Sequence, residues 1–110
     1  RMPVFVLREL AHAYHDQVLP GGFRNPEVLA AYQQAKASGA YDAVKRWTGE
    51  KFAEKPSKAY AMTNQMEYFA ESTESYFDRN DMEPFDRAEL RAKDPGMLKV
   101  VEAAWGVGRK

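Results

Sequence analysis

The chain has 110 residues, carries 16 basic and 16 acidic side chains for a net charge of zero, and contains no cysteine. This length predicts a single domain covering residues 1–110, and the balanced charge argues against nucleic acid or a membrane as a partner. The lack of cysteine excludes disulfides and thiolate metal sites, while 45% hydrophobic and 13% aromatic residues are typical of a packed globule rather than a disordered chain.

The first residue is Arg1 rather than Met, so we expect a fragment of a longer chain or a processed product. The apolar stretch 2–7 is too short to span a bilayer and lacks the layout of a signal peptide. The localisation therefore stays open, with a secreted or extracytoplasmic location favoured.

Two helices are predicted in the first third of the chain. The first runs over about residues 3–18 and is ended by the Pro-Gly-Gly run at 20–22. Asn25 is a good helix cap and is followed by Pro and Glu, which favour the first turn, so the second helix begins there. It continues to residue 38, where Gly39 supplies a left-handed stop.

The middle of the chain has a weaker pattern. Residues 41–45 could add a helical turn, and residues 48–51 have the composition of a tight turn. A short extended segment is predicted at 58–62. We therefore expect a small hairpin or a long irregular loop in this region.

Three further helices follow. Asn64 can cap the first of them, and Glu67 completes a possible capping box, so this helix is predicted to run to about residue 77. A short helix is predicted at 86–93, and a last one at 94–106 that begins with Asp-Pro. The expected fold class is therefore α+β and mainly α.

The motif that bears on function is Arg8-Glu9-Leu10-Ala11-His12. Histidines four residues apart on a helix can bind one zinc ion, and a Glu directly after the first can act as general base; this is the His-Glu-x-x-His helix of metallopeptidases. Here Arg8 stands in the first histidine's position. A guanidinium has no lone pair to donate, so Arg8 cannot be a metal ligand.

A second group of residues lies downstream. Glu67 and Glu71 are four residues apart on a predicted helix, so one could reach a metal while the other holds a histidine ligand. Tyr60 precedes them at the end of the predicted extended segment. Each of these features alone is also typical of a solvated helix face, but their occurrence together favours a site.

These residues together resemble the catalytic domain of the anthrax lethal factor-like zinc metallopeptidases, which are gluzincins. The stretches that carry the likeness are Glu9-Leu10-Ala11-His12-Ala13-Tyr14-His15-Asp16 and Tyr60-Ala61-Met62-Thr63-Asn64-Gln65-Met66-Glu67-Tyr68-Phe69-Ala70-Glu71. The resemblance implies a zincin-like C-terminal core. Since few residues precede the first helix, the family's N-terminal sheet is expected to be truncated or absent.

The resemblance also implies roles for the matching residues. Glu9 matches the general base and Tyr60 the tyrosine that supports the oxyanion or protonates the leaving amine. His12 and Glu67 match zinc ligands, and Glu71 matches the acid that supports the ligands. The implied cofactor is zinc and the implied partner is a peptide or protein substrate.

Arg8 divides the functional expectation into two classes. The first is a zinc metallopeptidase that is impaired as written, with weak or no zinc binding; the second is a non-catalytic pseudopeptidase with a binding or structural role. Without a metal, the clustered glutamates need another cation, so we predict a bidentate ion pair from Arg8 to Glu67 or Glu71. His15 is either a replacement ligand or a polar residue at the edge of its helix.

Overall fold

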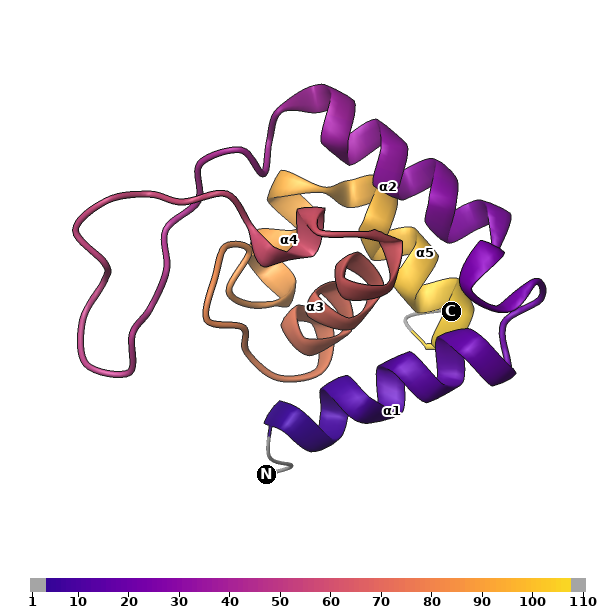
Figure 1. Cartoon of the computed structure of the whole chain (residues 1–110). Helices are drawn as coiled ribbons and strands as arrows, with labels where there is room; N and C mark the ends of the chain where they lie inside the picture. Colours follow the sequence, from indigo (N-terminus) through magenta and orange to yellow (C-terminus); the bar gives the residue numbers. More distant parts are fainter. Residues whose placement is uncertain (1–3, 108–110) are drawn as a thin grey trace.

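The fold is organised around helix α3 (Gln65–Phe77), which the other helices surround (Figure 1). The structure is a computed structural model and describes residues 4–107. Residues 68–76 of α3 are all buried, so this helix is covered on every side. The elements that contact α3 are α1 (Val4–Gln17), α2 (Pro26–Ser38), the 3-10 turn η2 (Tyr60–Met62), α4 (Arg87–Lys93) and α5 (Pro95–Trp105). A further 3-10 turn, η1 (Gly22–Arg24), joins α1 to α2.

The predicted helix starts are confirmed, and each has a side-chain cap. The Asn25 side chain accepts a hydrogen bond from the Val28 amide at 3.0 Å, and that of Asn64 accepts one from the Glu67 amide at 2.9 Å. Asp86 and Asp94 cap α4 and α5 in the same way. These bonds satisfy amides that have no partner within the helix, so the polar residue before each apolar run fixes where the helix begins. The predicted start of the first helix at residue 3 lies outside the described residues.

Residues 44–58 form an extended arm that projects from the helices (Figure 1). Two isolated antiparallel bridges, Val44 to Ser57 and Trp47 to Phe52, join its two sides, and a third joins Arg46 to Met82. The arm is therefore an irregular loop with hairpin-like pairing.

Two local predictions in this region are wrong. Residues 41–45 form no helical turn, because Val44 exchanges backbone hydrogen bonds with Ser57 instead. The predicted extended segment 58–62 ends early, since residues 60–62 form η2. This turn buries Ala61 and Met62 and reverses the chain into α3.

A partly buried carboxylate joins three parts of the chain. Asp94 Oδ2 accepts hydrogen bonds from the hydroxyls of Tyr41 at 2.9 Å and Tyr68 at 2.5 Å, while Oδ1 accepts from the Met97 amide. Burial, and then the negative charge of Asp94, raises the pKa of both phenols well above the usual range. Both phenols are therefore held as hydrogen-bond donors.

The fold is compact and mainly helical, with a Cα radius of gyration of 13.1 Å. This is consistent with the predicted mainly helical α+β class. Its extended backbone pairs only through the three isolated bridges, as far as residues 4–107 show. No helix in the same range is long and apolar enough to cross a bilayer.

Candidate functional site

The candidate site lies where α1 crosses α3. Arg8 and His12 are four residues apart on α1, so they project from one face of that helix. Facing them on α3 are three glutamates at heptad-like spacing, Glu67, Glu71 and Glu74. The crossing of the two helices brings these five side chains together.

Arg8 forms ion pairs with two buried carboxylates. Its Nη2 donates a hydrogen bond to Glu71 Oε2 and another, 2.8 Å long, to Glu74 Oε1. The Glu71 side chain is 4% exposed and that of Glu74 is fully buried. The predicted pair with Glu71 is confirmed, but its predicted bidentate geometry is wrong, because one guanidinium nitrogen serves both carboxylates. Glu74 was not anticipated as a partner.

Burial dominates the electrostatics of this cluster. It raises the pKa of Glu74 to about 7, although the hydrogen bond and charge of Arg8 oppose the shift. Burial also raises the pKa of Glu71, against the charge of Arg8 and a 2.9 Å hydrogen bond from Asn80 Nδ2. Burial alone would lower the pKa of Arg8, but the two glutamates outweigh it and raise that pKa. The cluster therefore holds one permanent cation between two carboxyls, one of which titrates near neutral pH.

His12 and Glu67 form the second half of the site. His12 Nε2 lies 3.4 Å from Glu67 Oε1, and both side chains are partly buried. These are the two predicted zinc ligands, and the structure brings them together. In the described part of the chain, however, no group of three or more His, Asp or Glu side chains is arranged to hold a metal ion.

The residues present therefore do not fit a three-ligand zinc site. The third position belongs to Arg8, whose guanidinium offers donors only and is held by Glu71 and Glu74. His12 and Glu67 are the two side chains at this crossing that could hold a metal.

The two residues predicted to be catalytic lie at the margin of this group. The Tyr60 ring centre is 5.6 Å from the guanidinium carbon of Arg8, and its side chain is 46% exposed. Glu9 is exposed and makes no side-chain hydrogen bond or ion pair with any residue from 4 to 107. The catalytic roles of both residues stay predictions.

His15 does not belong to the group. Its side chain is fully buried, and the expectation of a polar residue at the helix edge is wrong. The ring packs against Phe23 and Phe69 at centroid distances of 5.1 and 4.9 Å, and neither ring nitrogen has a hydrogen-bond partner within residues 4–107. Burial, together with the charge of His12, lowers the pKa of His15 to about 4. His15 is therefore a neutral core residue.

A cleft of about 360 Å³ opens beside Arg8. It is lined by Arg8, Arg46, Trp47, Thr48, Tyr60, Glu71, Asn80, Asp81 and Met82. The lining comes from α1, the arm, η2, α3 and the loop after α3, so this cleft forms only when all five meet. The ion pair of Arg8 with Glu71 lies at its wall.

Sequence reasoning missed two residues of this site. Glu74 lies seven residues after Glu67 and three after Glu71, so helical spacing alone could have placed it on the same face. Asn80 gave no such signal, because its bond to Glu71 depends on how the loop after α3 folds back.

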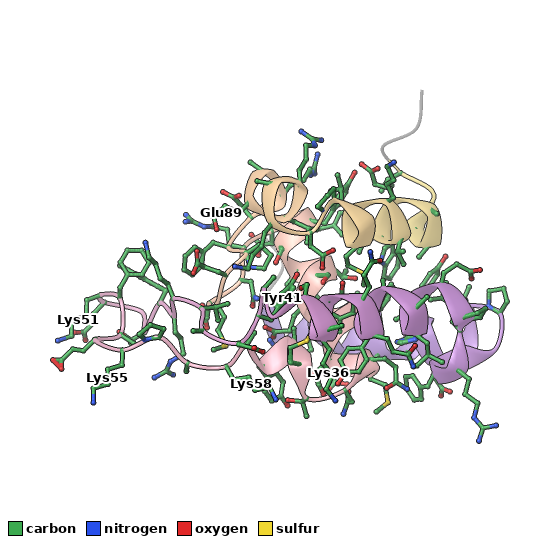
Figure 2. The ribbon with its side chains drawn as sticks, turned by 90° about the horizontal axis from the view of Figure 1, so that it is seen from above. Lys36, Tyr41, Lys51, Lys55, Lys58 and Glu89 are labelled. Atoms are coloured by element: carbon green, nitrogen blue, oxygen red, sulfur yellow. The ribbon has the colours of Figure 1, made fainter. Side chains whose placement is uncertain are left out.

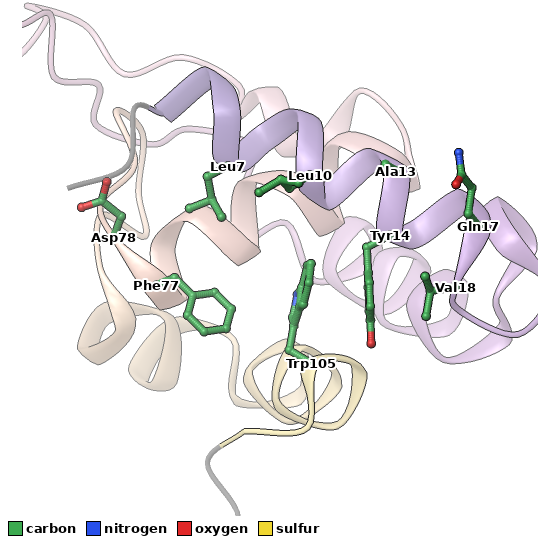
Figure 3. Close-up of a pocket in the computed structure, with 9 residues that line it drawn as sticks. All are labelled: Leu7, Leu10, Ala13, Tyr14, Gln17, Val18, Phe77, Asp78 and Trp105. Atoms are coloured by element: carbon green, nitrogen blue, oxygen red, sulfur yellow. The ribbon is translucent and has the colours of Figure 1, made fainter.

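A separate apolar cavity of about 630 Å³ lies on a different side of α1 (Figure 3). Leu7, Leu10 and Tyr14 of α1 and Val18 just after it line the cavity, facing Phe77 and Trp105. Tyr14 and Trp105 stack with ring centroids 4.0 Å apart. Arg8, His12 and Glu67 do not line this cavity, so it is not part of the candidate site.

Comparisons with known proteins give no identification. No protein-family model matches the chain, and neither the curated proteins nor the solved structures include a significant match.

Proposed function

We propose that this chain is a pseudopeptidase: a zincin-like, peptidase-derived domain that has lost zinc-dependent hydrolysis and keeps its cleft for binding peptides. The proposal joins the lethal factor-like motif of the sequence to the contacts made at the crossing of α1 and α3. Its catalytic ancestor would have used Glu9 as base and Tyr60 as oxyanion support, with His12 and Glu67 among the zinc ligands.

The observation that carries the proposal is the position of Arg8. Its guanidinium lies between Glu71 and Glu74 at the point where the motif requires a histidine. A fixed cation there opposes the entry of a second cation and replaces part of the positive charge that a metal would supply. Arg8 therefore stabilises the acidic site and removes a ligand at the same time.

A second candidate function, a weak metallopeptidase, rests on the pair of His12 and Glu67. Their side chains converge to 3.4 Å, the separation of two groups that could hold one ion. Two protein ligands leave a metal labile, however, and Arg8 would lie beside it. This makes robust hydrolysis the less favoured outcome.

The test compares zinc content in the purified chain and in the variant Arg8→His. We expect the variant to bind about one zinc per chain and the parent to bind none after dialysis. Arg8→His removes the cation between Glu71 and Glu74, so the two buried carboxylates repel each other. The double variant Arg8→His/Glu74→Gln removes one of these charges and is measured as well. Thermal unfolding verifies that each protein is folded.

Hydrolysis is measured on a quenched fluorescent peptide library with and without added zinc. No cleavage by the parent supports the pseudopeptidase. Zinc-dependent cleavage by the parent, removed by Glu9→Gln, would overturn it in favour of the weak metallopeptidase. Equal zinc content in the parent and the histidine variants would contradict the proposal that Arg8 stands in the position of a zinc ligand.

A further inference from the structure

The arm carries an excess of positive charge. Residues 44–58 contain five basic and two acidic side chains, although the net charge of the whole chain is zero. Lys51 and Lys55 lie toward the free end of the arm and Lys58 at its base (Figure 2). The remainder of the chain is therefore net acidic by the same amount.

A pocket of about 740 Å³ lies at the base of the arm. We call it the basic pocket; it is lined by Arg46, Ser57, Lys58, Ala59, Tyr60, Met62, Thr63 and Met82. The bridge of Arg46 to Met82 joins the arm to the loop after α3 here, and that of Val44 to Ser57 joins the two sides of the arm. Arg46 and Lys58 are thus brought to one concave surface.

The charged and hydroxyl side chains that line the basic pocket have no hydrogen-bond or ion-pair partner among the described residues. Arg46 and Lys58 are exposed, and neither side chain forms an ion pair or hydrogen bond with any residue from 4 to 107. The same holds for the side-chain hydroxyls of Ser57, Tyr60 and Thr63. By contrast, Arg8 is already neutralised by two glutamates. Within the described part of the chain, the pocket therefore presents two cations and three hydroxyls without partners to a ligand.

The basic pocket adjoins the cleft beside Arg8. Arg46, Tyr60 and Met82 line both hollows, so the two lie on either side of shared residues. A ligand that reaches both must be longer than a single ion, and the half-buried Met82 offers an apolar side chain that the two hollows share. This shape fits a peptide better than a free anion.

We propose that the basic pocket recognises a side-chain carboxylate of an acidic peptide, whose backbone continues past Tyr60 into the cleft beside Arg8. Arg46 supplies the planar donor fork that matches a carboxylate, and Lys58 supplies a second charge. The inference rests on the proposed peptide-binding function and adds to it the class of peptide that binds.

The test is a fluorescence anisotropy titration of the whole chain with short labelled peptides that have blocked ends. One peptide contains a central Glu-Glu pair and its twin contains Gln-Gln. The double variant Arg46→Gln/Lys58→Gln removes the two cations of the pocket. Its matched control, Lys51→Gln/Lys55→Gln, removes the same charge from the same arm outside the pocket.

We expect the Glu-Glu peptide to bind at least about tenfold more tightly than its Gln twin, since two charge-assisted contacts are lost in the latter. The pocket variant should weaken binding of the Glu-Glu peptide at least about tenfold, and the control variant less than about threefold. Equal weakening by the two variants would overturn the pocket in favour of diffuse attraction to the arm. Equal affinity for the two peptides would also overturn it.

Two further titrations distinguish the acidic side chain from other sources of negative charge. A peptide with a free C-terminus but no acidic side chain tests for recognition of the chain end, and inorganic phosphate tests for a small-anion site. Tight binding of either one, with no preference for Glu-Glu over Gln-Gln, contradicts the proposal. Neither result bears on zinc binding or hydrolysis, so failure of the basic pocket and failure of the pseudopeptidase assignment are distinguishable.

Discussion

Arg8 Nη2 lies 2.8 Å from Oε1 of Glu74, a fully buried carboxyl that the peptidase motif does not include. The same nitrogen bonds Glu71, so one side chain of α1 compensates two acids of α3. A buried carboxylate without a counter-charge is costly, and α1 and α3 make the most extensive helix–helix contact among residues 4–107. Arg8 therefore supports the packing of these helices.

Replacing Arg8 by Met is expected to destabilise the protein by about 2–3 kcal/mol, because the buried Glu71 and Glu74 lose a partner that is itself one third exposed and partly screened by solvent. The aliphatic stem is retained, so little packing is lost. The measurement is the free energy of unfolding from denaturant titration at pH 7.5.

Adding Glu74→Gln to Arg8→Met should restore part of this loss, since one buried negative charge is then removed. Arg24→Ala, which alters an exposed arginine, is the control and should change stability by less than about 0.5 kcal/mol. A loss for Arg8→Met as small as that of the control would mean that the ion pairs contribute little.

Glu74 should make stability decrease as the pH rises. Its folded pKa is raised from 4.5 to about 7, so the folded state binds more protons than the unfolded state between these values. The free energy of unfolding therefore falls through this window, by about 3 kcal/mol for this group. Glu74→Gln mimics the protonated acid and should remove that decrease.

The quantity to measure is the difference in unfolding free energy between Glu74→Gln and the parent at pH 5 and pH 8. The stability of Glu74→Gln relative to that of the parent should increase from pH 5 to pH 8. A difference that is constant across the window would show that Glu74 titrates alike in the folded and unfolded chains.

His15 should make stability increase as the pH rises, the opposite of the effect of Glu74. Its folded pKa is lowered from 6.5 to about 4, so the unfolded state binds more protons in this range. Stability from this group is complete above pH 6.5 and is lost as the pH falls toward 4, by about 3 kcal/mol. His15→Leu, of similar volume, also removes two buried nitrogens without partners in the described chain.

We therefore expect His15→Leu to be more stable than the parent at pH 5 and to gain less at pH 7.5. Thermal unfolding at the two pH values measures this. A variant that is less stable than the parent at both would indicate that the ring nitrogens have partners in solution.

The helix boundaries were predictable because they depend on local chemistry. Asn25, Asn64 and Asp94 are capping residues followed by helix formers, and each accepts the expected amide hydrogen bond. The proposed capping box was only half formed, since the Glu67 side chain lies near His12 rather than returning to the Asn64 amide. The contact of Glu67 with His12 on α1 thus replaces the capping-box hydrogen bond within its own helix.

The rest of the site depended on contacts between distant segments. Arg8 and Glu74 are 66 residues apart, and Asn80 reaches Glu71 only because a loop folds back on α3. The small hairpin or irregular loop predicted in the middle of the chain is confirmed as the arm, but its pairing was hard to predict, because the Val44–Ser57 and Arg46–Met82 bridges pair segments with weak local preference. Glu74 was also missed, although its spacing from Glu67 and Glu71 could have placed it on their face of the helix.

Asp94 serves two structural purposes at once. It caps α5 through the Met97 amide and accepts hydrogen bonds from the buried hydroxyls of Tyr41 and Tyr68. Asp86 caps α4 through the Glu89 amide and has no tyrosine partner among residues 4–107. Asp86→Ala should therefore cost about 1 kcal/mol, the usual value of a helix cap. Asp94→Ala should cost about 3 kcal/mol or more, since two phenols also lose their acceptor. Denaturant titration of both variants measures the two losses. Equal values would mean that water satisfies the tyrosines when Asp94 is removed, and that the carboxylate acts as a helix cap alone.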